Sequence, residues 1–138
     1  EQEWQQSAKG LFFLAVQENL PMSFVQALLA MGYTPVPLQG DGKVVDIAIQ
    51  RTADALRDRD ADVMLVSHDG DFAPQMQALA GNGRRLGLVA FGEFIATSLR
   101  QVPGIETFDL EYEVGAFTSR LPRVRVIPID EFDPAQFL

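Results

Sequence analysis

The sequence predicts an α/β domain, a three-layer α/β/α sandwich around a mainly parallel sheet. Short apolar runs alternate along the chain with helical patterns of roughly ten residues, which is typical of βαβ units. The runs are continuously apolar, as expected for parallel strands that are covered on both faces. With 138 residues, of which 47% are hydrophobic and 22% charged, the chain suits one domain with its own core.

The first predicted unit is strand, helix, strand. Residues 10–16 (GLFFLAV) form an apolar run that predicts a fully buried strand. Residues 21–31 predict a helix, with Ser23 as a candidate N-cap and Gly32 closing it. Residues 33–38 (YTPVPL) predict an extended segment, and its two prolines favour the edge of a sheet.

The middle of the chain continues the alternation. A turn at residues 40–42 precedes a helix expected at 44–57, where apolar residues recur at intervals of three to four. Residues 62–67 predict a strand. Residues 72–80 predict a helix that the glycines of 81–83 end.

The last third predicts one further strand-helix-strand unit. Residues 85–91 (RLGLVAF) predict a strand, residues 93–101 a helix and residues 106–110 a short strand. A final extended piece is expected at 124–129.

Two regions are expected in the chain. Residues 1–116 would form the α/β domain, and residues 117–138, which contain three prolines, would form a C-terminal extension. This tail is expected to pack on the domain or to contact a protein partner.

The composition of the chain limits the classes of function that are compatible with it. The formal net charge is −8, which argues against nucleic-acid binding by bulk positive charge. It is compatible with a carboxylate site for a divalent cation, and also with simple solubility. There is no cysteine, which fits a reducing compartment, and no apolar run reaches the length of a membrane span. We therefore expect a cytoplasmic protein without membrane contact.

A pair of aspartates follows one of the predicted strands. The apolar run Val63–Val66 stops, and Asp69 and Asp71 follow around Gly70 before a helical pattern resumes. Ligands of open α/β sheets bind outside the carboxyl ends of strands, and two carboxylates there suit a hard divalent cation. Gly70 would permit the backbone angles that aim both at one ion. The alternative is a capped turn, in which Asp71 is the N-cap of the next helix.

A third acidic residue is expected at the same edge. Lys43-Val44-Val45-Asp46 follows a glycine turn and begins a helix after a strand. Asp46 would lie at the carboxyl edge of the sheet. An acid in the first turn of a helix is also explained by the helix dipole alone.

Together these motifs resemble the NYN branch of the PIN-like nucleases, the group that includes LabA-like proteins. The motifs that carry the resemblance are Lys43-x-x-Asp46 at a helix start and a strand that ends Val66-Ser67-x-Asp69-x-Asp71-Phe72. Residues 24–37, 87–92 and 105–110 are similar to the connecting unit and later strands of the family. Residues 121–123 and 127–129 resemble the C-terminal stretch of an actinobacterial subgroup.

The resemblance implies a PIN-like (Rossmannoid) fold and a metal-dependent endoribonuclease, whose acidic residues bind Mg²⁺ or Mn²⁺ and activate water against RNA phosphodiesters. Carried over by position, the catalytic and metal-binding candidates are Asp46, Asp69 and Asp71, supported by Ser67 and Lys43. Family members begin with a strand that ends in an aspartate, which we expect upstream of Glu1. Thr52 stands where many relatives have a further aspartate.

Other residues have two interpretations each. Arg84 and Arg85 could contact RNA phosphates or be scattered surface charges. His68 could be a metal ligand or proton shuttle, or a solvent-facing loop residue. Asp58-x-Asp60-x-Asp62 lacks the glycine and glutamate of a calcium loop and is expected to be a solvated helix exit. Five aromatic residues are expected to be core or packing residues rather than base-stacking platforms: Trp4, Phe12, Phe13, Phe91 and Phe94.

Two other functions stay open beside an RNA-cleaving enzyme. The first is a catalytically weak or inactive domain of the same fold that binds RNA or a protein, which the overall acidity favours. The second is an aspartyl phosphotransferase, because Asp-x-Asp after a strand also serves phosphatases. Those enzymes place threonine or valine where Phe72 stands here. A homodimer is compatible with each of these functions.

Overall fold

Strands and helices alternate along residues 4–111 and 126–138, the part of the chain that this computed structural model describes. The strands are β1 (Gly10–Ala15), β2 (Tyr33–Leu38), β3 (Val63–Val66), β4 (Leu86–Ala90) and β5 (Ile105–Asp109). The α-helices are α1 (Met22–Ala30), α2 (Val44–Leu56), α3 (Ala73–Leu79) and α4 (Thr97–Arg100). Short 3₁₀ turns are η1 (Gly70–Phe72), η2 (Gly92–Phe94), η3 (Ile129–Glu131) and η4 (Pro134–Phe137). Within these residues no helix is both long and apolar enough to span a membrane.

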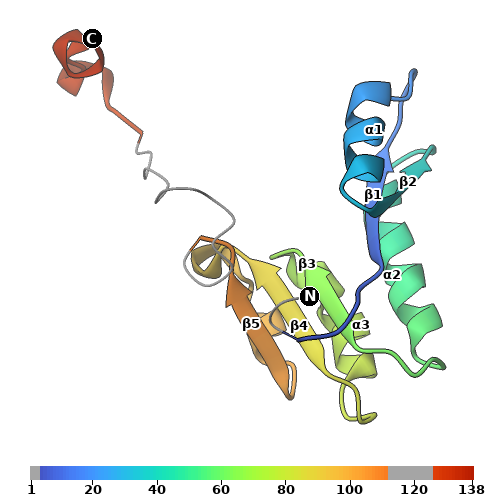
Figure 1. Cartoon of the computed structure of the whole chain (residues 1–138). Helices are drawn as coiled ribbons and strands as arrows, with labels where there is room; N and C mark the ends of the chain where they lie inside the picture. Colours follow the sequence, from blue (N-terminus) through green and yellow to red (C-terminus); the bar gives the residue numbers. More distant parts are fainter. Residues whose placement is uncertain (1–3, 112–125) are drawn as a thin grey trace.

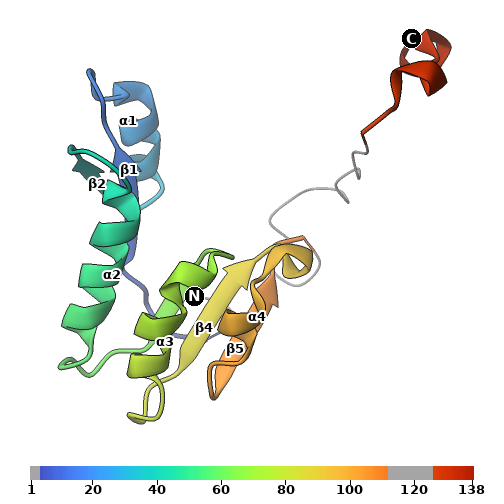
Figure 2. The ribbon, with the colours of Figure 1, turned by 180° about the vertical axis from the view of Figure 1, so that it is seen from behind.

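The strands are all parallel, which confirms the predicted α/β class, but they form two sheets rather than one. β1 pairs with β2, and β3, β4 and β5 pair in that order. Helix α2 connects the two sheets, because it contacts β1 of the first sheet and helix α3, which packs on the second (Figure 1). Helices α3 and α4 lie on the same face of the three-stranded sheet (Figure 2). In the described residues, β1 and β3 each have a strand partner on one side only.

The main core lies between the three-stranded sheet and its helices. Its buried residues are Ala53, Ala73, Met76, Leu79, Leu86, Leu88, Leu99 and Val102. A second, smaller core holds Leu14, Val25 and Leu28 between β1 and α1. The prediction that the first strand is fully buried was wrong, because Leu11 and Phe12 are partly exposed. The reason is that β1 has only one neighbouring strand.

Two helix predictions need correction. Helix α1 begins at Met22 with Pro21 as its N-cap, so Ser23 lies inside the first turn and caps nothing. The helix expected at 93–101 is broken into η2 and the short α4. Between them the backbone N–H of Ala96 donates to the carbonyl of His68 over 3.1 Å, so this residue is extended and tied to the loop after β3 instead of continuing a helix.

Arg85 connects the first described residues to the amino end of the three-stranded sheet. Its guanidinium donates two hydrogen bonds to the Glu106 carboxylate, of 2.6 and 3.0 Å, and lies 4.8 Å from the centre of the Trp4 ring. The Asp62 carboxylate accepts from the Arg85 backbone N–H and from the Gln6 amide, over 2.7 and 2.8 Å. The prediction that Asp62 belongs to a solvated helix exit was therefore incomplete, because its carboxylate accepts hydrogen bonds from two other residues.

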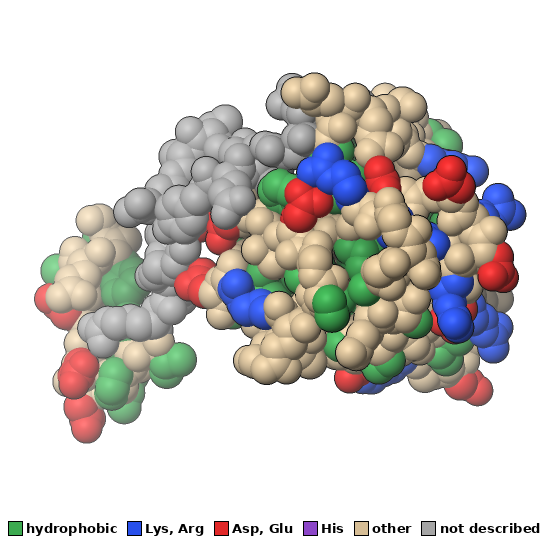
Figure 3. Space-filling view, turned by 90° about the horizontal axis from the view of Figure 1, so that it is seen from below, with side chains coloured by type: hydrophobic (Ala, Val, Ile, Leu, Met, Phe, Trp, Pro, Cys, Tyr) green, Lys and Arg blue, Asp and Glu red, His purple; other side chains and the backbone are tan. Residues whose placement is uncertain are grey.

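The C-terminal segment consists of the two short turns η3 and η4. Asp133 accepts a hydrogen bond from the backbone N–H of Ala135, and the rings of Phe132 and Phe137 lie 5.7 Å apart. The segment displays hydrophobic and acidic side chains (Figure 3). Of the extended piece expected at 124–129, residues 124–125 lie outside the described residues, residues 126–128 form no strand and Ile129 begins η3. The predicted boundary at 116 also lies outside the described residues.

Core burial leads to the first prediction. Leu88 lies in the central strand and is 0% exposed, so Leu88→Ala should lower the free energy of unfolding by about 2 to 5 kcal/mol. Urea unfolding followed by circular dichroism measures this. The matched control is Val66→Ala in the neighbouring strand, where the side chain is 67% exposed and a change within about 0.5 kcal/mol is expected. Equal losses in both variants would contradict the assignment of the core.

The Arg85 network predicts an acid-sensitive contribution to stability. Hydrogen bonds from Gln6 and from the Arg85 backbone lower the pKa of Asp62, and the bond from the Arg85 side chain lowers the pKa of Glu106. A lowered folded-state pKa adds stability above the unfolded pKa of about 4, which is lost as the pH falls through the folded value.

The double variant Asp62→Asn, Glu106→Gln should therefore lose less stability than the wild type between pH 6 and 3. Urea midpoints measured across that range give the comparison, with Asp41→Asn in an exposed turn as control. A double variant with the same acid dependence as the wild type would show that these bonds do not govern it.

Candidate metal centre

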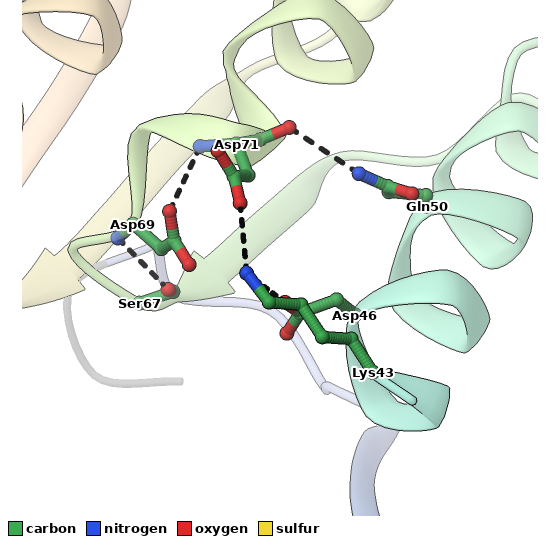
Figure 4. Close-up of polar contacts among 6 residues, drawn as sticks. All are labelled: Lys43, Asp46, Gln50, Ser67, Asp69 and Asp71. Atoms are coloured by element: carbon green, nitrogen blue, oxygen red, sulfur yellow. Dashed lines mark hydrogen bonds and ion pairs between the residues drawn. The ribbon is translucent and has the colours of Figure 1, made fainter. Parts of the chain in front are cut away.

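Three carboxylates converge where α2 begins and β3 ends. Asp46, Asp69 and Asp71 each offer one oxygen, and these oxygens all lie within 4.8 Å of one another. Asp46 and Asp69 are partly buried, whereas Asp71 is exposed. Figure 4 shows the three side chains with Lys43 beside them. The three aspartates that the sequence proposed as metal ligands are thus brought together in the fold.

The loop after β3 is shaped by hydrogen bonds to side chains. The backbone N–H of Asp69 donates to the Ser67 hydroxyl over 3.1 Å, and the N–H of Asp71 donates to Asp69 Oδ1 over 2.9 Å. Asp69, and not Asp71, is therefore the N-cap, and the element that it caps is η1. The capped turn and the carboxylate pair, which the sequence offered as alternatives, are present together, since the cap uses one of the two Asp69 oxygens.

Gly70 is required for a different reason from the one expected. Its φ is not among the positive values of the chain, so it does not supply a left-handed conformation. A Cβ at this position would lie 2.8 Å from the Ser98 hydroxyl and 3.1 Å from the Ala96 Cβ. The glycine allows the acidic loop to approach the segment around α4 closely.

Helix α2 contributes Asp46 in its first turn and Lys43 at its N-cap. The Lys43 ammonium lies 3.6 Å from Asp71 Oδ2 and 4.0 Å from Asp46 Oδ2, and its side chain is 74% exposed. One turn further along, the Gln50 amide donates to the Asp71 backbone carbonyl over 3.4 Å. These contacts link the acid on α2 to the acids after β3, and they place a positive charge beside the carboxylates (Figure 4).

Arg84 and Arg85 lie at the amino ends of the strands, opposite the acids. The Arg84 guanidinium donates to three backbone carbonyls at the end of α2, those of Leu56, Arg57 and Ala61. Arg85 is bonded to Glu106. On the face of the molecule that Figure 3 shows, acidic and basic side chains are interspersed. Their role in RNA binding stays a prediction, and they take no part in the acidic site.

Three other residues near the site are singled out in the sequence. Thr52 turns its hydroxyl back to the carbonyl of Ala48 over 2.7 Å, so it does not replace a ligand. His68 is exposed, and its ring lies 6.1 Å from the Phe94 ring. Phe94, expected to be a core or packing residue, does not lie in the core, because its side chain is 60% exposed. A signal was available in the sequence: Phe94 follows Gly92 and Glu93 directly after a strand, at the edge where ligands bind.

The sequence and fold match known proteins. The family model described as NYN domain matches residues 12–110. A solved structure of a protein of unknown function from Vibrio parahaemolyticus is similar in fold, with a TM-score of 0.58 and 18% sequence identity. The similarity covers 73% of this chain and 68% of the other. Among curated proteins no match is found.

The position of Lys43 predicts competition with a bound cation. Lys43→Met should raise the affinity of the carboxylates for Mn²⁺ by up to about fivefold, because an exposed ion pair contributes at most about 1 kcal/mol. Isothermal titration calorimetry with Mn²⁺ measures the change. Lys9→Met, just before the amino end of β1, serves as control and should leave the affinity unchanged. Weaker Mn²⁺ binding by the Lys43 variant would mean that the lysine supports the site instead of competing.

Proposed function

We propose that this chain, which belongs to the NYN domain family, is a ribonuclease that hydrolyses RNA phosphodiesters at Asp46, Asp69 and Asp71 with Mg²⁺ or Mn²⁺ bound. The observation that carries the proposal is the convergence of three carboxylates at the carboxyl edge of parallel strands. That edge is where ligands of open α/β sheets bind.

The residues present fit a divalent cation. Mg²⁺ takes oxygen ligands at about 2.1 Å, so two ligands of one ion lie up to about 4.2 Å apart. Oxygens already within 4.8 Å reach that spacing by small side-chain rotations. The Lys43 ammonium, which lies near two of these carboxylates, supports a preference of this position for positive charge.

Each residue has a distinct role in this proposal. A bound divalent cation would supply Lewis acidity, polarising the phosphodiester and lowering the pKa of a water molecule. Asp46 and Asp71 hold the cation from two different elements. Asp69 orients the loop through one oxygen and offers the other to the ion. Lys43, once displaced from the carboxylates, remains long and exposed enough to contact a phosphate oxygen of the substrate.

A second candidate is a domain of the same fold that binds RNA without cleaving it. The observation that favours it is that Thr52 stands where many relatives have an aspartate, so the described part of the site has three carboxylates rather than four. An incomplete ligand set would weaken metal binding and turnover, while leaving the surface for RNA intact.

Two acids on the same helix test the proposal. Asp46→Asn removes a ligand and should lower Mn²⁺-dependent cleavage of single-stranded RNA by at least about 100-fold, because losing even an indirect partner of a metal costs 10- to 100-fold. Asp54→Asn, on the same helix but exposed and outside the cluster, should retain activity within about twofold.

Cleavage of a fluorescent RNA and Mn²⁺ titration are measured for both variants. Equal activity of the two variants would exclude Asp46 from the site. Wild-type protein that binds the RNA in Mn²⁺ without cleaving it would favour the second candidate.

A further inference from the structure

An aromatic pair lies next to the acidic site. Phe94, in η2 after β4, is 60% exposed, and its ring lies 6.1 Å from that of His68 at an interplanar angle of 52°. His68 is also exposed and directly precedes Asp69. On its other side the Phe94 ring contacts Phe91, 6.3 Å away in an edge-on arrangement. Two exposed rings therefore lie at the carboxyl edge of adjacent parallel strands, and one of them belongs to the residue that precedes Asp69 of the cluster.

The loop that presents Phe94 is held at several points. The Gly92 N–H donates to Asp109 Oδ2 over 2.8 Å, and the Arg100 guanidinium donates to the Gly92 carbonyl. The Phe94 N–H donates to the Phe91 carbonyl over 2.9 Å. A Cβ on Gly92 would lie 2.7 Å from Asp109, so this position requires glycine. The backbone that carries the exposed ring is thus held in place, which lowers the ordering cost of binding a ligand there.

Position separates Phe94 from other exposed apolar side chains. Single exposed hydrophobic residues are ordinary on protein surfaces. Met22 and Leu29, for example, are exposed on helix α1, which contacts β2 of the two-stranded sheet. Phe94 is paired with a second ring, and the loop that carries this second ring also carries Asp69 and Asp71.

We propose that Phe94 and His68 form a stacking platform for an unpaired base of single-stranded RNA, next to the phosphodiester that the acidic site receives. The inference rests on the proposed function and specifies its substrate as single-stranded. Unstacked bases are bound in this way on aromatic side chains, whereas a base inside a duplex is already stacked on its neighbours.

The charge of the protein supports a contribution from stacking. Proteins that hold RNA through lysine and arginine release counterions and gain affinity from the phosphates. This chain has a net charge of −8 and three carboxylates at the site, so the phosphates by themselves provide little attraction. A base stacked on an aromatic ring adds affinity that depends little on salt.

The test measures binding without turnover. A labelled single-stranded ten-nucleotide RNA is titrated by fluorescence anisotropy, with Ca²⁺ in place of Mn²⁺. Phe94→Ala should weaken binding by about 5- to 150-fold, the range of one stacked base, and Phe94→Trp should preserve it. Phe137→Ala is the matched control, since Phe137 is 62% exposed and also pairs with another ring, and binding should be unchanged. Circular dichroism confirms that each variant is folded.

A second substrate set isolates stacking from other effects. An abasic site moved along the RNA should weaken wild-type binding at one position and have no effect there in Phe94→Ala, because both changes remove the same contact. The same coupling is expected with single-stranded DNA, since the ring contacts the base and not the sugar. A duplex of the same sequence should bind more weakly.

Several results would overturn the platform. These are equal losses for intact and abasic RNA in Phe94→Ala, equal binding of duplex and single strand, or no binding of RNA by the wild type. Cleavage in Mn²⁺ without the abasic coupling would leave the ribonuclease proposal standing and exclude the platform. Coupling without cleavage would support the platform and count against the ribonuclease.

Discussion

Mutual repulsion among three carboxylates is the constraint that the rest of this structure has to meet. At separations within 4.8 Å, the negative charges of each pair repel one another, and more weakly where solvent screens the pair. The fold offsets this with directed contacts: the Asp71 N–H donates to Asp69, the Gln50 amide holds the Asp71 carbonyl, and Lys43 lies beside two of the acids. A protein that tolerates such repulsion at the carboxyl edge of a sheet is suited to a cation there.

The acids and the aromatic pair are connected through the same short loop. Residues 67–72 carry His68, whose ring meets Phe94 of the loop after β4, and Asp69 and Asp71, whose carboxylates meet Asp46 of α2. A bond from Ala96 to the His68 carbonyl ties the two loops together. A nucleic acid lying along this edge would therefore meet a cation at one point and a ring at the next. Such an arrangement would let an acidic protein bind a nucleic acid, because the cation attracts the phosphate and the ring binds the base.

Most elements could be predicted from the sequence because their cause is local. Apolar runs such as 63–66 and 86–90 became strands, and Asp46 could be placed at the carboxyl edge because it begins a helix that follows a strand. Features that depend on contacts distant in sequence could not be predicted in this way. The helix expected at 93–101 is interrupted by a bond to His68, and Gly70 is required by side chains of residues 96 and 98. The exposure of Phe94 also escaped prediction, since apolar character alone predicts burial.

The division of the strands into two sheets gives the acidic site a structural consequence. Asp46 belongs to α2, which packs on β1, whereas Asp69 and Asp71 follow β3 of the other sheet. Between the two sheets the described residues form no strand pairing, so the contacts of α2 and the Gln50 bond to Asp71 hold the acids together. A cation shared by these three side chains would bind both parts at once, and its binding free energy would add to the stability of their packing. Occupancy of the site and the packing of the two sheets would then be linked equilibria, so that the chemistry of the site depends on the junction that α2 forms between the sheets.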